Sequence, residues 1–325
     1  MKKLRIAICG YGNLGRGVER ALQNAPDAEA VAVISRRPPH LLRELTPLPV
    51  CPLSEAFALE GQVDVLILAS GSAADLPVQT PMLAARFDTV DSFDTHGQIS
   101  AHIAAVDRSA SSSGHLSLIG AGWDPGLFSV ARVLSDAVLP DGTTAVFWGR
   151  GVSQGHSNAI RRIPGVRDAR AYTVPVPGAA EAALQGLASP LPPTAAHRRE
   201  CFVVTEDDAD RDRIARDIRS LPEYFLGYDT IVTFITPEEM QRDHAALPHA
   251  GQVIRSGRAD GHRSRLTFGV SMESNPAFTG GILVAYARAV FRLRRQGLTG
   301  CITPLDVPPA ALSPRSPEQL QRKFL

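Results

Sequence analysis

The sequence predicts an α/β fold with a doubly wound parallel sheet, followed by a second α+β domain. Three observations predict it. An apolar stretch, a glycine-rich turn and a helical pattern follow one another within residues 4–25. Apolar strands then alternate with helices to about residue 125, which is typical of a parallel sheet covered on both faces. After that point several strands follow with few helices, which favours an antiparallel sheet covered on one face. We expect domain boundaries at 1–125 and 126–275, with 276–325 packing back on the first domain.

The first element is the strand Leu4–Cys9, which leads through a glycine loop into the helix Arg16–Ala25. The loop has the spacing G-x-G-x-x-G and consists of Gly10, Tyr11, Gly12, Asn13, Leu14 and Gly15. In this context the first glycine permits the turn, the second lets the backbone approach a pyrophosphate, and the third lets the helix pack close to the strand. The stretch therefore predicts a Rossmann-type dinucleotide site, with a purely structural turn as the alternative.

The residues at the end of the second predicted strand, Glu29–Ser35, indicate whether the chain binds NAD or NADP. An NAD-binding chain would carry an acidic residue near the end of this strand, to hold the ribose 2′-hydroxyl. This chain reads Ser35, Arg36 and Arg37 instead. A hydroxyl and two guanidiniums suit a 2′-phosphate. We therefore predict NADP rather than NAD, with a solvated basic turn as the alternative.

Three further strands end in small or polar residues. They are Val63–Ala69, Thr89–Asp91 and Leu116–Gly120, with helices at Thr80–Phe87 and Ala101–Ser113. Ligands in such sheets lie beyond the carboxyl ends of the strands. We therefore expect cofactor contacts from the residues that follow them, namely Ser70, Gly71, Ser72, Ala73, Ser92, Phe93, Asp94, Ala121, Gly122, Trp123, Asp124 and Pro125. Plain turns are the alternative, and a single Asp after a strand is most often a turn former or helix cap.

The second half begins with a helix at Phe128–Leu139 and a strand at Thr143–Trp148. We expect a glycine-rich polar loop at Gly149–Ser157, and then five strands and three helices. The strands are one through Tyr172–Val174, Cys201–Thr205, Thr230–Ile235, Gly251–Ser256 and Arg265–Met272. The helices are Ala179–Leu187, Asp207–Leu221 and Phe278–Gln296, the last returning to the first domain. The proline-rich tail Pro304–Pro317 is expected at the surface.

The composition narrows the functional class. Of 325 residues, 44% are hydrophobic and 21% charged, and the net charge is +1, so nothing favours nucleic acid or a membrane as partner. Cys9, Cys51, Cys201 and Cys301 lie far apart, which argues against a metal site or disulfide framework and for a reducing cytoplasm.

Polar residues that could line a cleft beside the cofactor form a mixed set. They are Asp94, Asp124, Trp148, Ser153, Gln154, Thr173, Arg199, His249 and Asn275. Carboxylates, a guanidinium and amides suit a zwitterion better than a sugar or an aldehyde. The residues alone thus predict an NADP-dependent oxidoreductase that acts on an amino acid or a similar polar acid.

The chain resembles the meso-diaminopimelate dehydrogenase family over essentially its whole length. The motifs that carry the resemblance are Gly-Tyr-Gly-Asn-Leu-Gly-Arg at 10–16, Ser-Arg-Arg at 35–37, Gly-Trp-Asp-Pro-Gly at 122–126, Phe-Trp-Gly at 147–149, Ser-Gln-Gly-His-Ser at 153–157, Arg-Arg-Ile-Pro-Gly-Val at 161–166, Cys-Phe-Val-Val at 201–204 and Asn-Pro at 275–276. Val152 and Gln252 are positions where this chain is expected to vary from its relatives.

The resemblance implies a cytoplasmic homodimer that uses NADP to deaminate the D-centre of meso-2,6-diaminopimelate oxidatively. It places Asp94, Asp124 and Trp148 around the reacting centre, and either Asp accepts the proton, directly or through water. Ser153 and Gln154 form a further substrate loop. Thr173, Arg199, His249 and Asn275 grip the distant L-centre. Residues 1–125 would bind NADP and residues 126–275 would bind substrate and dimerise.

Three alternatives stay open. The enzyme could be a broader NADP-dependent D-amino-acid dehydrogenase of the same fold, a reductase of an amino-acid-derived aldehyde, or an NADP sensor without activity. Three of the candidate site residues could instead have purely structural roles. Arg199 could form a surface ion pair, His249 could cap a turn and Trp148 could belong to the core. His156 is expected to be structural.

Overall fold

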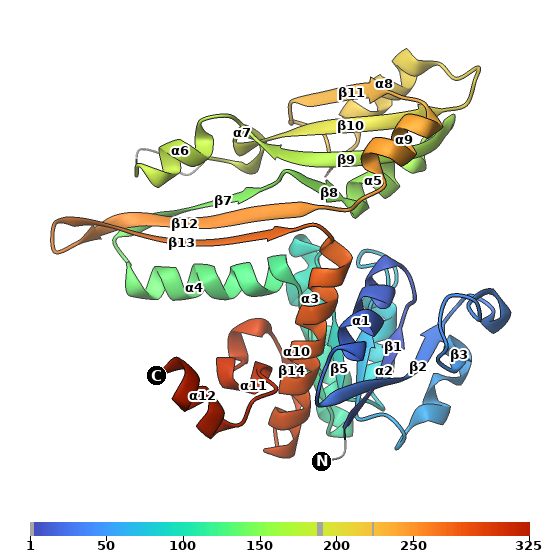
Figure 1. Cartoon of the computed structure of the whole chain (residues 1–325), viewed down its shortest axis with the longest axis vertical. Coiled ribbons are helices and arrows are strands. Elements are labelled where there is room, and N and C mark those ends of the chain that lie inside the picture. The colour runs from blue at the N-terminus through green and yellow to red at the C-terminus, as the bar shows by residue number, and fades with distance from the viewer. Residues whose placement is uncertain (1–2, 187–190, 223) are drawn as a thin grey trace. The chain divides into compact units, whose positions relative to one another are not determined.

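The computed structural model describes residues 3–186, 191–222 and 224–325. The chain forms two compact units (Figure 1). One comprises Met1–Val130 together with Pro276–Leu325, and the other comprises Ala131–Asn275. Each unit has its own sheets and its own apolar core, so each is described by itself.

The first unit is built on a seven-stranded sheet in which every neighbouring pair is parallel. The strand order is β14-β6-β5-β4-β1-β2-β3. Chain order therefore runs outward from β1 in both directions, which places the connections on opposite faces and makes the sheet doubly wound. The predicted fold class is confirmed. The strands are β1 Leu4–Cys9, β2 Ala28–Ser35, β3 Val50–Pro52, β4 Val65–Leu68, β5 Thr89–Asp91, β6 Leu116–Leu118 and β14 Gly300–Ile302.

The sequence missed the two short edge strands, β3 and β14. The helices associated with this unit are α1 Asn13–Gln23, α2 Leu76–Ala84, α3 Ile99–Ser113, α10 Asn275–Arg295, α11 Pro309–Leu312 and α12 Pro317–Phe324. Short 3₁₀ turns lie at Pro39–Leu41, Leu53–Leu59, His96–Gln98 and Pro304–Asp306. The segment Trp123–Leu127 is a turn in which Asp124, Pro125 and Gly126 have non-helical backbone angles.

Helices α1 and α10 meet backbone to backbone at two glycines. A Cβ atom placed on Gly17 of α1 would lie 2.1 Å from the carbonyl oxygen of Pro276. One placed on Gly280 of α10 would lie 2.4 Å from the carbonyl carbon of Gly17. No side chain fits between the two helices there, so the helix that follows the glycine loop is seated directly on the long C-terminal helix.

The second unit contains two sheets rather than the single antiparallel sheet that the sequence predicts. One has four strands in the order β11-β10-β9-β8, and the other has three in the order β13-β12-β7. All pairs are antiparallel except β10 and β11, which are parallel because helix α8 connects them. The strands are β7 Gly142–Trp148, β8 Gly151–Ser153, β9 Val166–Pro175, β10 His197–Thr205, β11 Thr230–Phe234, β12 His249–Ala259 and β13 His262–Met272.

The second unit contains six helices within the described residues, and one of them, α5, begins where the sequence predicts a loop. They are α4 Phe128–Val138, which begins in the first unit, α5 Gln154–Arg161, α6 Ala179–Leu184, α7 Pro193–Ala196, α8 Arg211–Ser220 and α9 Pro237–His244. The stretch expected to be a loop, Gly149–Ser157, contains strand β8 and the start of α5 instead. Ser153 caps that helix by accepting a hydrogen bond from the backbone N–H of His156. The last residue of the helix expected at 179–187 lies outside the described residues.

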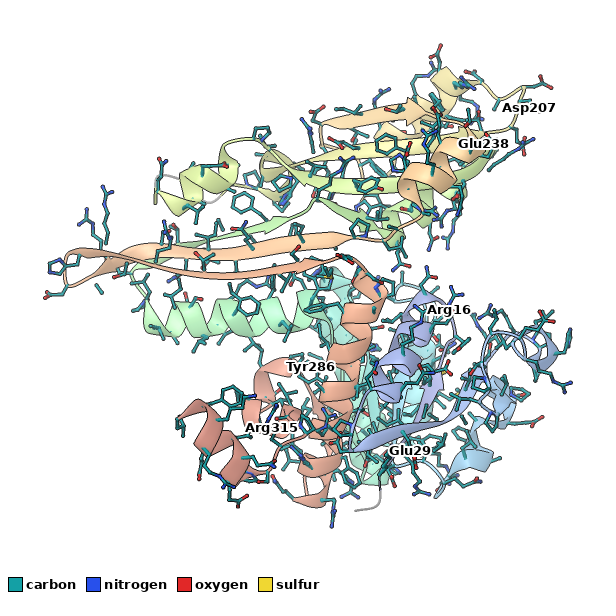
Figure 2. All side chains as sticks on the ribbon, in the orientation of Figure 1. Arg16, Glu29, Asp207, Glu238, Tyr286 and Arg315 are labelled. Atoms are coloured by element: carbon teal, nitrogen blue, oxygen red, sulfur yellow. The ribbon has the colours of Figure 1, made fainter. Side chains whose placement is uncertain are left out.

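Each unit has an apolar core, and charged residues lie at its surface as well as at a few buried positions. Tyr286 of α10 is fully buried in the first unit, whereas Asp207 and Glu238 are exposed on the second (Figure 2). The core of the four-stranded sheet forms where Ala169, Ala171, Cys201 and Val203 meet residues from α5, α8 and the following turn, namely Ile160, Ile163, Ile214, Ile218 and Phe225. In the described part of the chain, no helix is both long enough and apolar enough to cross a membrane.

Candidate functional site

The glycine loop has the geometry that a pyrophosphate requires. Gly10 has φ +90°, and a Cβ there would lie 2.6 Å from Ser70 Oγ. A Cβ on Gly15 would lie 2.1 Å from the carbonyl oxygen of Gly10, so the helix and turn touch. Around Gly12, by contrast, nothing lies within 4 Å of the Cβ position. The middle of the loop is thus open at the amino end of α1, where backbone N–H groups attract an anion.

Tyr11 takes part in this loop through its backbone only. Its ring is buried beside Val33 and Leu42, and its hydroxyl contacts the carboxylate of Glu19 and the carbonyl of Leu45. A cofactor would meet the main chain at this position. The buried ring attaches the loop to the segment that follows β2.

The two arginines after β2 have different surroundings. The Arg37 guanidinium donates to the carbonyl oxygen of Tyr11, and its backbone N–H donates to Ser35 Oγ at 3.0 Å. The side chain of Arg36 is 65% exposed and pairs with Asp75 at 2.7 Å. Arg37 therefore holds the turn in place, while Arg36 presents a guanidinium beside the glycine loop, as binding of a 2′-phosphate needs.

A buried carboxylate, Asp91, ties the next two strand ends together. Its oxygens accept hydrogen bonds from the backbone N–H of Phe93 at 3.1 Å and of Gly120 at 3.0 Å. They also contact Thr80 Oγ1 at 2.9 Å and His102 Nε2 at 2.6 Å. Asp91 is completely buried. It is therefore a structural hub that joins the turn after β5 to the turn after β6.

Asp94 and Asp124 follow those two joined turns. The backbone N–H of Asp94 donates to Ser72 Oγ at 2.8 Å, which brings the segment Ser70–Ala73 against the turn after β5. The Asp94 side chain is exposed, and Asp124 is partly buried and has an extended backbone in the turn after β6. The structure therefore brings both predicted acids to the carboxyl ends of neighbouring strands.

Two aromatic residues from the predicted cofactor set point into the first unit. Phe93 is 1% exposed and stacks on His102 with ring centroids 4.1 Å apart. Trp123 is 9% exposed and meets Phe128 edge to face. Their side chains support the turns, so a cofactor at these turns would meet mainly backbone and the smaller residues around them.

In the second unit, strand register aligns three predicted substrate residues. Arg199 of β10 pairs with Thr173 of β9, and Thr173 pairs with Gly151 of β8. A Cβ on Gly151 would lie 2.3 Å from the imidazole of His249, so this ring occupies the place where a side chain would project. Ser153 lies two residues along β8 and therefore faces the same side. Arg199, Thr173 and Ser153 thus share one face of the four-stranded sheet, and the His249 ring of β12 lies against this face at Gly151.

Arg199 is the most unusual charge in this cluster. It is 6% exposed, and its guanidinium contacts Thr173 Oγ1 and lies over the Tyr228 ring, 4.0 Å from the centroid. Its Nε is buried and has no hydrogen-bond partner among the described residues. Burial lowers the pKa of Arg199. Within residues 3–186, 191–222 and 224–325, no ion pair to a carboxylate offsets this charge. A buried cation of this kind suits an incoming carboxylate.

The predicted residue Trp148 is held by His197, a histidine that no sequence motif indicates. The backbone N–H of Trp148 donates to His197 Nε2 at 2.8 Å, and the two rings stack with centroids 5.0 Å apart. His197 Nδ1 lies 3.2 Å from the carbonyl oxygen of Pro193. Burial lowers the pKa of His197 to about 4, so the ring is neutral and Nδ1 carries the proton. His197 therefore fixes the end of β7 that carries Trp148.

The remaining predicted residues mark the starts of two helices. Gln154 begins α5 and Asn275 begins α10.

Buried histidines lie beside the predicted substrate residues. Ser153 Oγ contacts His156 Nδ1, and burial lowers the pKa of His156 to about 3. His156 is thus a neutral partner for the Ser153 hydroxyl, and the rings of Tyr224 and Phe225 lie edge-on to it. Burial also lowers the pKa of His249, so the cluster contains neutral imidazoles beside one cation.

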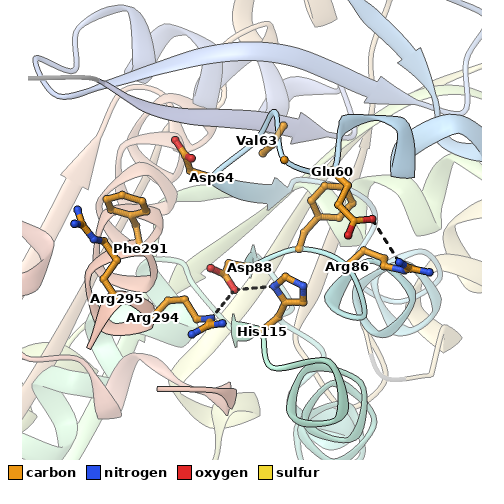
Figure 3. Close-up of a pocket in the computed structure, with 11 residues that line it drawn as sticks. Glu60, Val63, Asp64, Arg86, Asp88, His115, Phe291, Arg294 and Arg295 are labelled. Atoms are coloured by element: carbon orange, nitrogen blue, oxygen red, sulfur yellow. Dashed lines mark hydrogen bonds and ion pairs between the residues drawn. The ribbon is translucent and has the colours of Figure 1, made fainter. Parts of the chain in front are cut away.

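The first unit also has a hollow of about 280 Å³, which lies at the amino ends of three strands of its sheet (Figure 3). Asp64, Asp88 and His115 line it and directly precede β4, β5 and β6. Asp88 accepts from His115 Nδ1 at 3.1 Å and lies 3.7 Å from Arg294 Nε. None of the predicted site residues lines it. Because ligands of such sheets bind at the carboxyl ends, this hollow is not the cofactor site.

No group of three or more His, Cys, Asp or Glu residues in the part of the chain that the structure describes could hold an ion. The four cysteines are unpaired, and burial raises the pKa of Cys9, Cys201 and Cys301 to about 12, so these thiols stay protonated.

The chain was compared with family models, curated proteins and solved structures, and the matches indicate one enzyme family over the whole chain. Residues 122–274 match the family model of the diaminopimelic acid dehydrogenase C-terminal domain. The chain is 48% identical to the meso-diaminopimelate D-dehydrogenase of Ureibacillus thermosphaericus, covering 100% of both chains. The C. glutamicum DAP dehydrogenase in complex with DAP matches with a TM-score of 0.95 and 41% identity over 100% of both chains. An engineered D-amino acid dehydrogenase bound to NADP⁺ matches with a TM-score of 0.92 and 39% identity, again over 100% of both chains. The chain belongs to the meso-diaminopimelate D-dehydrogenase family.

Proposed function

We propose that this chain is an NADP-dependent meso-diaminopimelate D-dehydrogenase. It deaminates the D-centre of meso-2,6-diaminopimelate oxidatively and reversibly, which gives L-2-amino-6-oxopimelate and ammonia. The observation that carries the proposal is Arg199, a buried guanidinium beside Thr173 with no ion-pair partner among the described residues. A substrate with a second carboxylate, remote from the reacting carbon, supplies the missing charge.

Each unit has a proposed role. Residues 1–125, with 276–325, bind NADP, and residues 126–275 bind substrate. The open backbone at Gly12, the turns after β4, β5 and β6, and the exposed Arg36 fit this cofactor. Arg36 holds the 2′-phosphate and the amino end of α1 faces the pyrophosphate. When bound, NADP supplies the acceptor for the hydrogen that leaves the D-carbon with its electron pair.

The reaction also requires a proton to leave the substrate. The ammonium nitrogen must lose a proton before its lone pair can form the C=N bond. A carboxylate oxygen of Asp94 or Asp124, directly or through one water, is the acceptor. Both side chains follow turns that Asp91 fixes. Water then adds to the imine carbon, the nitrogen leaves as ammonia, and a ketone remains at the former D-centre.

Recognition of the far end of the substrate sets its orientation. Arg199 and Thr173 bind the distal carboxylate, and His249 and Asn275 bind the distal L-centre. Ser153 and Gln154 contact the chain between the two centres. The binding energy of this end is used to orient the D-carbon, since productive geometry accounts for much of the rate. Trp148, held by His197, borders the reacting centre.

We further propose a cytoplasmic homodimer formed through the second unit. Helix α4 exposes Val133, Leu134 and Val138 by 53%, 60% and 62%, which is an apolar face that a second copy of the chain could cover. Reduced cysteines are consistent with a reducing compartment.

NADPH formation with separate meso-, LL- and DD-diaminopimelate tests the proposed function. Turnover of the meso isomer with NADP, and far slower reaction with LL, is expected because only the D-centre reacts. Failure to oxidise the meso isomer would refute the proposal. Comparable turnover of D-alanine or D-lysine would favour the broader D-amino-acid dehydrogenase.

A further inference from the structure

Arg199 touches an aromatic ring that neither the motifs nor the family resemblance singles out. Its guanidinium carbon lies 4.0 Å from the centroid of the Tyr228 ring. One terminal nitrogen of the same group contacts Thr173 Oγ1. A guanidinium is planar, so a ring against its face and a hydroxyl at one edge leave little freedom to rotate. The remaining edge includes Nε, which is buried without a partner in the described part of the chain.

The turn that carries Tyr228 is anchored on both sides of this ring. The backbone N–H of Tyr228 donates to the carbonyl oxygen of Phe225 at 3.0 Å, and Phe225 is completely buried. The backbone N–H of Arg199 donates to the carbonyl oxygen of Asp229 at 2.8 Å. Phe225 also lies edge-on to His156, with centroids 5.5 Å apart. The turn is therefore attached to the strand that carries Arg199 and to the apolar core beneath it.

We propose that Tyr228 is a positioning residue that makes the enzyme selective for substrates with a distal carboxylate. Its ring fixes the plane of the Arg199 guanidinium, so that the remaining N–H edge meets both carboxylate oxygens together. Without the ring, Arg199 keeps its charge but can rotate out of that plane. This inference rests on the proposed function, because it assumes that the distal carboxylate binds Arg199.

Two substitutions distinguish the effect of the Tyr228 ring from the effect of its hydroxyl group. Tyr228→Phe keeps the stacked face, and Tyr228→Leu removes it while keeping an apolar side chain. The KM for meso-diaminopimelate should rise about tenfold in Tyr228→Leu, as expected for loss of a desolvated cation–π contact, and less than threefold in Tyr228→Phe. The kcat should change much less than KM, because the reacting centre is untouched.

D-Lysine is the matched probe, since it is diaminopimelate without the distal carboxylate. Its KM, or its Ki against meso-diaminopimelate where turnover is slow, should change less than twofold in Tyr228→Leu. In an Arg199→Met background, Tyr228→Leu should cause no further loss, because the two residues act through one contact. The KM for NADP and the melting temperature verify that each variant is folded.

Three results would overturn the inference. Tyr228→Leu could weaken D-lysine and meso-diaminopimelate equally, leave both unchanged, or be matched by Tyr228→Phe. These results differ from a failure of the proposed function, in which the unmodified enzyme itself does not oxidise meso-diaminopimelate.

Discussion

Replacement of Arg199 by methionine should weaken catalysis and, at the same time, stabilise the protein without substrate. The two effects have separate causes. In catalysis, the variant loses a charge-assisted pair with the distal carboxylate, which contributes about 2–4 kcal/mol. This loss corresponds to a decrease of about 30- to 900-fold in kcat/KM for meso-diaminopimelate.

The stability effect follows from the burial of the charge. Arg199 is 6% exposed and has no ion-pair partner among the described residues, so its desolvation costs several kcal/mol in the folded protein. Against this stand the contact with Thr173, about 1 kcal/mol, and the contact with Tyr228, about 0.5–2 kcal/mol. Methionine removes all three and fills similar volume. We therefore expect the free energy of unfolding to rise by about 1–3 kcal/mol without substrate.

NADPH formation at varied substrate and thermal melting without ligands measure the two effects on the same preparation. Arg198→Met is the control, because Arg198 precedes Arg199 on β10 but already pairs with Glu200 at 2.7 Å. It should change kcat/KM less than threefold. A decrease in kcat/KM below fivefold for Arg199→Met would remove this residue from the substrate site. A clear fall in melting temperature would show that the charge is compensated after all.

Three further predictions concern the cofactor, the proton and pH. Arg36→Ala should raise the KM for NADP about 10- to 100-fold, because a charge-assisted phosphate contact is lost, while the KM for NAD stays within twofold; equal effects on both would contradict the phosphate role. Of Asp94→Asn and Asp124→Asn, the one that removes the proton acceptor should lower kcat at least 100-fold and flatten the acid limb of its pH profile, whereas a loss under tenfold in both would exclude this role. His197 is neutral when folded, with its pKa lowered to about 4, so its contribution to stability is complete above about pH 6.5 and falls as the pH decreases toward 4, by about 2 kcal/mol at pH 5. Denaturation of His197→Gln at pH 7 and pH 5 should show a pH dependence smaller by that amount, and an unchanged dependence would refute it.

The first half of the fold could be predicted because its signals are local. A buried strand, a glycine loop and a helix lie within the first 25 residues, and the fold class that they and the following strands and helices indicate is confirmed. The family, which motifs along the whole chain indicate, is confirmed as well. Strand β14 was missed because it has only three residues and exists through its pairing with β6. Strand β8 was missed for the same reason, since Gly151–Ser153 is defined by its pairing with β9 and not by its own residues.

Features of the site that depend on contacts between distant residues could not be predicted from the sequence either. The family resemblance could indicate Arg199, but only the fold shows that it is buried without a carboxylate partner among the described residues. Tyr228 is 29 positions further along the chain, and no sequence pattern links the two. His197 is a single histidine in a strand, and its bond to the backbone of Trp148 follows from packing between strands that are distant in sequence. Asp91 could be read as a turn former, yet it joins two strand ends.

The contact between Gly17 and Gly280 affects how mutational scans of this enzyme should be interpreted. Even alanine at either position would push α1 away from α10, because a Cβ there would lie 2.1 or 2.4 Å from backbone atoms of the other segment. The displaced helix carries, at its amino end, the N–H groups that we propose face the pyrophosphate. Such variants would present as weak NADP binders, although neither glycine faces the cofactor. A survey that ranks residues by activity alone would therefore assign both glycines to the binding pocket, when their role is to set how closely two helices approach.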